Sequence, residues 1–302
     1  MNAASPQAVA APNRAAGVRP KPNAARAIVR YYDECEVDYR MIWGLGRSLA
    51  IHYGHWDETT RSLHAALERQ NRLLAETAQV TERDHVLDAG CGVGGSSIYL
   101  ARRTGCRALG ITLSPRQAES ARRNARARAV GDRTRFAVMD YARTGLRAET
   151  FDVVWALESV CYAEDKAAFV REAFRLLRPG GRLVLADGFA ARDIYAAEER
   201  HVMETWLRGW AVDWLATPHG FERYLRDAGF GSIAYTDVTR NIMPSARLLY
   251  AHSLYALVIG KMAERLRIRT PVQTGNIVGS RWQYPAFRRG LACYGFFYAE
   301  KR

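Results

Sequence analysis

H-V-L-D-A-G-C-G-V-G-G, residues 85–95, is a short apolar run followed by one aspartate and four glycines within six residues. This pattern predicts a buried strand that ends in a glycine-rich turn and leads into a helix at 96–103. Such a turn exposes backbone N–H groups. We therefore expect a polar ligand to bind there.

The spacing of the glycines leaves the identity of that ligand open. Gly90, Gly92 and Gly95 match the G-x-G-x-x-G pattern of dinucleotide-binding loops. A nicotinamide dinucleotide also needs an acidic residue about 20 positions further on, to hold its ribose hydroxyls. No Asp or Glu occurs between Asp88 and Glu119. The sequence therefore favours a different ligand.

Strands and helices are expected to alternate after this turn. The expected further strands are 106–112, 135–139, 151–157, 182–187, 232–238 and 291–299. The expected helices are 59–79, 114–130, 166–177, 194–215, 220–228 and 244–267. The second strand, 106–112, is followed by a capping box, S-P-R-Q at 114–117, with proline at the first helical position. This order predicts an α/β fold, a parallel sheet covered on both faces, and a ligand at the carboxyl ends of the strands.

The composition narrows the class of protein. The 302 residues are 48% hydrophobic, which suits a substantial core and excludes wholesale disorder. The net charge is +13, but the arginines are scattered and no nucleic-acid motif accompanies them, so we expect no nucleic-acid partner. The five cysteines are dispersed and form no C-x-x-C pair. This usage indicates a reducing compartment, the cytoplasm, and predicts neither disulfides nor a metal site.

The flanking segments predict further parts of the molecule. Residues 1–26 have the composition of a disordered tail, which an organellar transit peptide shares. Residues 27–79 predict a helical cap before a core at 80–302, with further cap helices at 190–228 and 244–268. Trp206, Trp210 and Trp214 are spaced to lie along one helix face. The helix at 244–267 is interrupted by charged residues, so no membrane span is expected.

Three motifs resemble those of the class I S-adenosylmethionine (SAM) methyltransferases. The D-x-G-x-G-x-G arrangement at 88–94 resembles motif I, L-L-R-P-G-G at 176–181 resembles the family's turn before a strand, and D-Y at 140–141 its adenine-contacting position. The resemblance implies a Rossmann-like seven-stranded sheet with helices on both faces, and SAM as the cofactor. The residues that it assigns to SAM are Asp88, Gly90, Gly92, Gly94, Thr112, Ser114, Gln117, Asp140, Tyr141 and Leu157.

One position departs from the usual family pattern. Most class I methyltransferases place an acidic residue after the second strand to hold the ribose, and this chain has G-I-T-L-S-P-R-Q at 110–117. That run resembles the branch that contains cyclopropane fatty acid synthases, sterol C-methyltransferases and tocopherol methyltransferases. Ser114 or Gln117 is left as the substitute for the acid.

Other stretches resemble enzymes that methylate isoprenoids. W-A-L-E-S-V-C-Y-A at 155–163 is similar to a segment of sterol C-methyltransferases and, more loosely, of geranyl diphosphate and teleocidin-type prenyl C-methyltransferases. Y-Y-D at 31–33 and Y-G-H-W at 53–56 resemble short motifs of the same branch. The resemblance implies C-methylation of an alkene carbon in an isoprenoid or prenylated secondary metabolite, such as a terpenoid.

That chemistry selects the candidate catalytic residues. Methyl transfer to an alkene leaves a carbocation, which needs aromatic faces or a carboxylate nearby and then a base. Glu158 is the expected cation-stabilising residue or base, with Tyr31 and His55 as further catalytic candidates. The expected acceptor-binding residues are Tyr32, Trp43, Tyr53, Cys161, Trp206 and Trp210.

Two other function classes remain open from the sequence. One is an O- or N-methyltransferase of a phenolic or alkaloid small molecule, with His52, His55, His201 or His219 as the base. The other is a SAM-binding scaffold or pericyclase that does not methylate. The segment 27–56 is expected to close over a small hydrophobic or prenylated acceptor, and it also offers a contact to a second copy of the chain.

Overall fold

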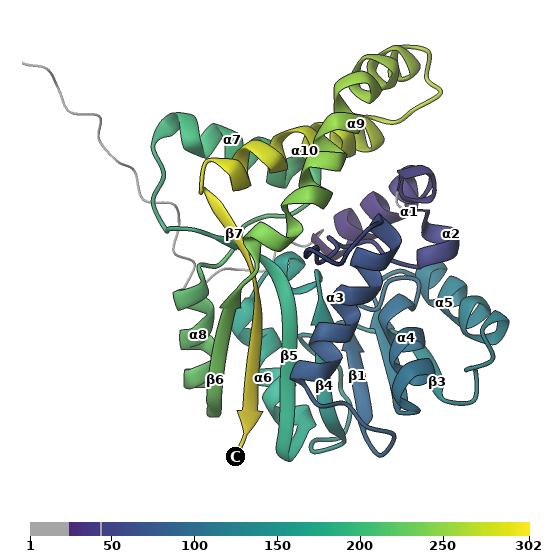
Figure 1. Ribbon diagram of the computed structural model, residues 1–302, viewed down its shortest axis with the longest axis vertical. Coiled ribbons are helices and arrows are strands. Elements are labelled where there is room, and N and C mark those ends of the chain that lie inside the picture. Colours follow the sequence, from purple (N-terminus) through teal and green to yellow (C-terminus); the bar gives the residue numbers. More distant parts are fainter. Residues whose placement is uncertain (1–23, 43) are drawn as a thin grey trace, which may run out of the picture.

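A seven-stranded sheet forms the centre of the molecule (Figure 1). The computed structural model describes residues 24–42 and 44–302. The strand order is β3-β2-β1-β4-β5-β7-β6; β7 is antiparallel to both neighbours and the other pairs are parallel. The strands are β1 (His85–Ala89), β2 (Arg107–Thr112), β3 (Thr134–Val138), β4 (Phe151–Leu157), β5 (Leu177–Ala190), β6 (Phe230–Asp237) and β7 (Ala292–Lys301). The predicted seven-stranded α/β fold is confirmed, although the sequence did not indicate that β7 runs antiparallel.

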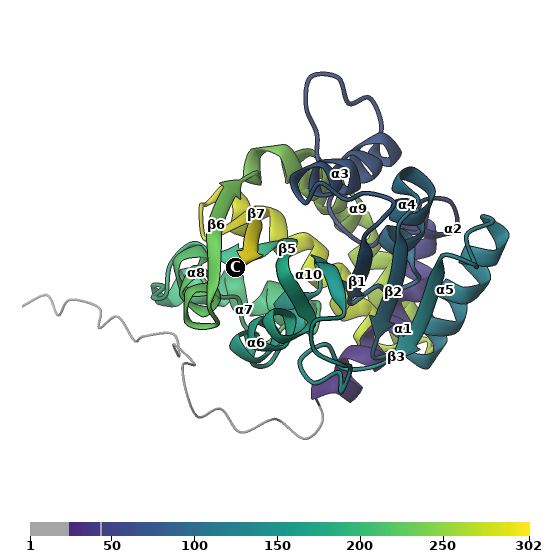
Figure 2. The same ribbon diagram turned by 90° about the horizontal axis from the view of Figure 1, so that it is seen from below.

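Helices cover both faces of this sheet (Figure 2). Neighbouring residues of a strand point to opposite faces, so Trp155 and Val184 belong to one buried cluster, and Val154 and Leu185 belong to another. Helices α3 and α4 pack in the first cluster, and α6 and α8 pack in the second. The helices are α1 (Ala24–Ile42), α2 (Leu45–Ser48), α3 (Leu63–Thr77), α4 (Gly95–Thr104), α5 (Pro115–Ala127), the 3₁₀ helix η1 (Val160–Tyr162), α6 (Lys166–Leu176), α7 (Ala197–Gly209), α8 (Pro218–Asp227), α9 (Thr239–Arg265) and α10 (Pro271–Arg288).

A cap of helices lies beyond the carboxyl ends of the parallel strands (Figure 1). It consists of α1, α2, α7, α9 and α10, and α10 packs against α7, α9 and α1. The sequence analysis predicted no helix between the helix at 244–267 and the strand at 291–299, where α10 lies. Pro271 begins this helix, and a Cβ on Gly279 would overlap the indole of Trp210. Glycine therefore permits close packing between α10 and α7.

The predicted row of three indoles on one helix was wrong for Trp214. Helix α7 ends at Gly209, and Ala211 adopts a left-handed φ of 55°, which stops the helix. Trp206 and Trp210 remain in contact, with ring centroids 5.8 Å apart. Trp214 lies instead 4.0 Å from the ammonium of Lys166.

Smaller differences concern the edges of elements. Ser114 caps α5, but the side chain of Gln117 accepts a hydrogen bond from Thr112 and does not complete the expected capping box. Helix α8 packs against α6 and β6, so the predicted cap segment 190–228 contributes only in part to the cap. Residues 24–26 belong to α1, and the rest of the predicted tail lies outside the described residues.

Candidate active site

One cavity lies over the glycine turn, at the carboxyl ends of β1, β2 and β4. It has an empty volume of about 950 Å³. We call it the glycine-loop cavity. Its lining includes Asp88, Gly90, Gly92, Gly95, Ser96, Thr112, Ser114, Gln117, Tyr141 and Leu157.

The turn needs glycine for two reasons. Gly90, Gly92 and Gly94 have φ values of 91°, 51° and 88°, a region that residues with a Cβ rarely adopt. A Cβ on Gly90 would also overlap the side chain of Ser159, whose hydroxyl donates a hydrogen bond to the Ala89 carbonyl oxygen. The glycine turn and the segment after β4 are thus in contact.

Asp88 fixes the start of the helix that follows the turn. Its Oδ2 accepts hydrogen bonds from the Ser97 N–H at 3.1 Å and from the Ser97 hydroxyl at 2.6 Å. Burial raises the pKa of this carboxyl to about 6, against the lowering effect of the Ser97 hydrogen bonds. These contacts hold the N-terminus of α4 toward the cavity, where Gly95 and Ser96 lie in its lining.

The far end of the glycine-loop cavity is built by residues after β2 and β3. The Thr112 hydroxyl donates to Gln117 Oε1 at 2.7 Å, and the Ser114 hydroxyl donates to a carboxylate of α1, Asp33, at 2.8 Å. Tyr141 lies in the lining and donates its hydroxyl to the Ser159 carbonyl oxygen. The cap thereby supplies an acidic side chain next to the position where the second strand lacks one.

Two residues predicted for this site lie outside the lining. Asp140 is exposed and accepts a hydrogen bond from the Ala142 N–H in its own turn. Gly94 is the N-cap of α4, and a Cβ there would crowd Ala121 and Phe136. Their assignment to the cofactor remains a prediction.

The N-terminal cap closes over the glycine turn. A Cβ on Gly95 would overlap the carbonyl oxygen of Leu49, so the two backbones touch. Residues 48–52 all contribute to the glycine-loop cavity. The segment 27–56, predicted to close over the site, therefore includes a wall of this cavity.

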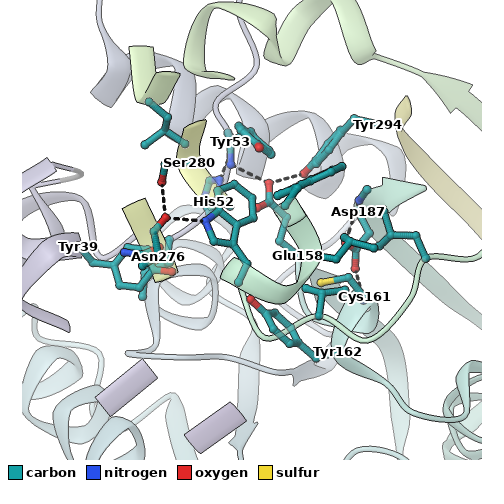
Figure 3. Close-up of a pocket in the computed structure, with 18 of the residues that line it drawn as sticks. Tyr39, His52, Tyr53, Glu158, Cys161, Tyr162, Asp187, Asn276, Ser280 and Tyr294 are labelled. Carbon is teal, nitrogen blue, oxygen red and sulfur yellow. Dashed lines mark hydrogen bonds between the residues drawn. The ribbon is translucent and has the colours of Figure 1, made fainter. Parts of the chain in front are cut away.

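A second cavity adjoins the first and lies between the sheet and the cap (Figure 3). We call it the aromatic cavity; its empty volume is about 820 Å³. Its lining as described contains three carboxyl groups, those of Asp38, Glu158 and Asp187, and neither lysine nor arginine. The aromatic side chains in the lining are Tyr32, Tyr39, Tyr53, Tyr162, Trp206, Trp210, Phe287 and Tyr294.

Glu158 lies where the two cavities meet, because it belongs to the lining of both. Its Oε1 accepts hydrogen bonds from the Tyr53 N–H at 2.6 Å and the Tyr294 hydroxyl at 2.8 Å (Figure 3). Its φ of 49° is left-handed, a strained conformation that is common at functional sites. Burial raises the pKa of this carboxyl from its ordinary value of 4.5 to about 8, although both hydrogen bonds lower it. The strand, the cap and β7 together place this carboxyl at the junction.

Asp187 is a second carboxyl of the aromatic cavity, and the sequence reasoning missed it. Its Oδ2 accepts a hydrogen bond from the Cys161 N–H at 2.8 Å, and burial raises its pKa. It ends the stretch predicted as the fifth strand, so the rule that ligands meet the carboxyl ends of strands was the available signal.

A buried lysine, Lys166, fixes the turn that follows β4 and carries Cys161. Lys166 is 3% exposed, and its ammonium donates to the carbonyl oxygens of Cys161, Ala163 and Trp214. Burial lowers its pKa to about 8, against the opposing effects of Cys161 and Asp187. Lys166 therefore fixes the turn that carries Cys161 into the aromatic cavity.

His52 is the histidine that lies in the lining of both cavities. Its Nδ1 lies 2.8 Å from the Tyr53 carbonyl oxygen, so this nitrogen carries the proton. Burial lowers the pKa of the imidazole to about 4, which keeps the ring neutral near pH 7. A neutral imidazole is able to accept a proton from a substrate.

The other predicted catalytic residues lie outside both linings. Tyr31 is buried behind the aromatic cavity and donates its hydroxyl to Asn276. His55 packs against Phe296, with ring centroids 6.0 Å apart. Among the predicted acceptor-binding residues, Trp43 lies outside the described residues. The others are in the lining of the aromatic cavity: Tyr32, Tyr53, Cys161, Trp206 and Trp210.

Comparisons with known proteins fit this geometry. A family model described as a methyltransferase domain matches residues 87–185. The chain is 32% identical over 227 residues to the 27-O-demethylrifamycin SV methyltransferase of Amycolatopsis mediterranei, across 75% of this chain and 80% of that protein. The chain belongs to the class I SAM-dependent methyltransferases. The resemblance noted in the sequence is thereby confirmed.

Other relatives of this methyltransferase differ in their chemistry. GfsG, a methyltransferase of Streptomyces halstedii, is 36% identical over 165 residues, which are 54% of this chain and only 58% of GfsG. The [4+2]-cyclase SpnF is 26% identical with a TM-score of 0.74, over 94% of this chain and 99% of SpnF. A geranyl diphosphate methyltransferase is 24% identical with a TM-score of 0.74, over 92% and 100%, and shares the fold. The fold and the family are shared, and the acceptor is not fixed by them.

The residues of the glycine-loop cavity fit the cofactor of this family. The N-terminus of α4 faces the cavity, and a helix N-terminus attracts a carboxylate such as that of the methionine part of SAM. Leu113, Met139 and Leu157 offer apolar contacts at the other end of the lining, which suit a flat adenine ring. The described residues of the methyltransferase contain no group of three or more His, Cys, Asp or Glu side chains arranged to hold a metal ion.

Proposed function

We propose that this protein is a SAM-dependent C-methyltransferase that methylates an alkene carbon of an uncharged isoprenoid or prenylated small molecule. The observation that carries the proposal is the position of Glu158. Its carboxyl lies at the junction of the glycine-loop cavity and a cavity walled by aromatic rings. A carboxyl and aromatic faces are what a carbocation requires.

In this proposal the two cavities have separate tasks. SAM supplies an electrophilic methyl group on a sulfonium when it is bound in the glycine-loop cavity. Residues of the aromatic cavity hold the alkene in line with that methyl group. The entropy cost of orienting the two reactants is then met on binding and does not add to the reaction barrier. The new carbon–carbon bond forms as the carbon–sulfur bond breaks, and the positive charge moves to the neighbouring carbon of the acceptor.

Side chains of the aromatic cavity then stabilise that positive charge, and Glu158 removes it by taking a proton. Faces of Tyr53, Trp206 and Trp210 are in the cavity lining and stabilise a cation by their π electrons. Ionised Glu158 takes a proton from the adjacent carbon, so an alkene re-forms and the charge is lost. A carboxyl with a pKa of about 8 is a stronger base, once ionised, than an ordinary glutamate.

The charges of the aromatic cavity support an uncharged acceptor. A diphosphate needs lysine, arginine or a metal ion nearby. The cavity lining described here has no lysine or arginine and includes Asp38, Glu158 and Asp187. Glu158 and Asp187, where ionised, repel an anion, whereas Asp38 is paired with Arg269 outside the lining. We therefore place free or scaffold-attached prenyl groups ahead of prenyl diphosphates.

The test is transfer of a ¹³C-labelled methyl group from SAM to a panel of acceptors. The panel contains a prenylated indole, a sterol, a prenyl alcohol and the matching prenyl diphosphate. The proposal expects transfer to an uncharged acceptor, with the label bound to carbon in the NMR spectrum of the product. Transfer only to the diphosphate would contradict the uncharged acceptor, and label on oxygen or nitrogen would contradict C-methylation.

O-methylation is the second candidate, and His52 is the observation that favours it. This neutral imidazole lies in the lining of both cavities and is the base that a hydroxyl acceptor would meet there, although its lowered pKa makes it a weak one. Several relatives are named as O-methyltransferases. This candidate expects His52→Gln to abolish transfer while Glu158→Gln retains it, and C-methylation expects the reverse. No transfer to any acceptor, with intact SAM binding, would favour a cyclase like SpnF.

A further inference from the structure

The second half of α9 exposes large apolar side chains to solvent. We call residues 254–268 the apolar arm; in Figure 1 it projects from the body of the molecule above α1 and α2. Its exposed fractions run from 45% at Leu254 to 77% at Ile268. The exposed apolar side chains are Leu254, Tyr255, Val258, Ile259, Met262, Leu266 and Ile268. A patch of this kind on a folded protein usually marks an interaction site.

The arm belongs to a helix that is well anchored in the protein. Ile242, Ala246, Leu249 and Ser253 are buried, and their spacing of three or four residues defines one face of α9. The exposed residues from Leu254 to Met262 follow the same period on the opposite face. The exposed face is therefore a continuous stripe on a helix of fixed orientation.

Basic side chains border this stripe. Lys261, Arg265 and Arg267 are exposed, and the helical period places Lys261 and Arg265 beside Leu254 and Val258. The acidic residue of the arm, Glu264, falls on another side of the helix. An apolar stripe edged with cations is the pattern of helices that lie in the surface of an anionic membrane.

The end of the arm is tied to the cap helix α1. Arg269 forms an ion pair with Asp38, and the Thr270 hydroxyl donates to Glu34. Exposed Val37 and Met41 lie on the same face of α1 as these two acidic residues. The apolar surface thus continues toward α1.

The same helix also reaches the aromatic cavity. Leu249, one turn before the arm begins, is part of the cavity lining, and so is Asp38 of α1. Helices α9 and α1 therefore contribute both to the exposed apolar surface and to the lining of the aromatic cavity. An apolar acceptor dissolved in a lipid phase would therefore enter the aromatic cavity near Leu249, where α9 passes from its buried half to the exposed arm.

We propose that the apolar arm docks this protein on the surface of an anionic lipid bilayer, with its apolar stripe among the acyl chains and its cations at the headgroups. By length and composition alone, helix α9 is apolar enough to cross a membrane. Its first half is nevertheless built into the core, so the exposed half is available for insertion into one leaflet. A second copy of the chain is a weaker occupant, because a twofold contact uses the same patch on both copies and would gather Lys261 and Arg265 of each in one interface.

Vesicle co-sedimentation of the full chain tests the docking without SAM or an acceptor, so it is independent of the proposed function. One set of vesicles is pure phosphatidylcholine, and the other contains phosphatidylglycerol as well. The proposal expects binding to the anionic vesicles that weakens as salt is added, and much weaker binding to the neutral ones.

Two variants separate the apolar and charged contributions. Val258→Glu combined with Ile259→Glu is expected to lower the vesicle affinity at least tenfold, because two carboxylates would enter the interface. The combined changes Lys261→Gln, Arg265→Gln and Arg267→Gln are expected to lower the affinity for anionic vesicles by roughly a hundredfold, at about fivefold per cation.

A matched control removes the same charge elsewhere. Arg83→Gln, Arg126→Gln and Arg147→Gln take three exposed arginines from segments that contribute nothing to the arm, and should leave tight binding in place. Failure of the natural chain to bind anionic vesicles would overturn the proposal. So would equal losses in the arm variant and the control, or a dimer that Val258→Glu and Ile259→Glu dissociate in the absence of vesicle binding.

Discussion

The two cavities of this protein are built in different ways. The glycine-loop cavity is formed mainly by backbone that leaves consecutive parallel strands, and most of its residues lie between 88 and 159. The aromatic cavity is formed by side chains from α1, η1, β5, α7, α9, α10, β7 and the segments between elements, which are spread from residue 32 to residue 294. One is a local feature of the fold and the other is assembled from the whole chain.

This difference separates a part of the site that constrains its residues from a part that tolerates substitution. A loop that requires glycine tolerates few changes, so its ligand stays the same. A wall of aromatic and aliphatic side chains accepts many substitutions of similar volume, so its ligand can change. Glu158 belongs to both cavities, and its carboxyl is therefore where the cofactor and the acceptor are expected to meet.

The largest effect is expected from Gly90→Ala. The added Cβ would overlap Ser159, and the φ of 91° strains any residue other than glycine. We expect the affinity for S-adenosylhomocysteine to fall at least a hundredfold, measured by isothermal titration calorimetry. Gly145→Ala is the matched control, because Gly145 has a φ of 69° and open space around it. Equal affinities in Gly90→Ala and the control would contradict the role of the loop.

The aromatic cavity should respond to Trp210→Phe. Trp210 lies in its lining, and Trp214, which has the same spacing in the sequence, does not. We expect KM for the acceptor to rise about fivefold in Trp210→Phe, because contact area is lost, while the affinity for S-adenosylhomocysteine is unchanged. Trp214→Phe serves as the control and should keep both values. A rise of KM in both variants would contradict the assignment of Trp210, but not Trp214, to the lining of the aromatic cavity.

The thermal stability of the protein should depend on the ionisation of Glu158. The pKa of Glu158 is raised from 4.5 to about 8, so its stabilising contribution is complete below pH 4.5 and is lost as the pH rises through about 8. Glu158→Gln resembles the protonated form and keeps the acceptor oxygen for Tyr53 and Tyr294. We expect this variant to melt several degrees above the natural protein at pH 8.5 and at a similar temperature at pH 5. A difference that does not depend on pH would contradict the raised pKa.

The smallest effect is expected from Tyr294→Phe. The Tyr294 hydroxyl lowers the pKa of Glu158 by donating to Oε1, so its removal raises that pKa further. The rate of methyl transfer by an ionised base rises with pH, and the rising limb should move to higher pH in the variant. The pH profile of kcat/KM measures this movement. A profile that stays in place, with a lower rate throughout, would mean that Tyr294 acts by packing alone.

The glycine-loop cavity was largely predictable because its information is local. The strand, the turn and the start of the helix follow one another at 85–103, and the glycine spacing needs no distant partner. The role of Asp140, assigned by family resemblance, remains a prediction. The structure shows it as an exposed carboxylate that accepts a hydrogen bond from the Ala142 N–H.

For the aromatic cavity, the sequence predicted several of the lining residues but not how they are arranged. Aromatic residues before and after the core were assigned to it, but spacing alone grouped Trp214 with Trp206 and Trp210. The left-handed Ala211 that separates them has no signal in the sequence. Helix α10 was missed because Gly279 and Pro285 usually interrupt helices, whereas here Gly279 makes room for Trp210. Asp187 was missed because no motif marks it in the sequence, and only the folded sheet places it in the same cavity as Glu158.

The most direct test of the account is a single-turnover comparison of Glu158→Gln with the natural protein, once an acceptor has been found. Both proteins are saturated with SAM and acceptor, and the appearance of methylated product is followed in time. The account predicts that the variant binds S-adenosylhomocysteine with unchanged affinity and transfers the methyl group at least a hundredfold more slowly. Transfer at the natural rate would contradict the central claim that the reaction is completed by this carboxyl.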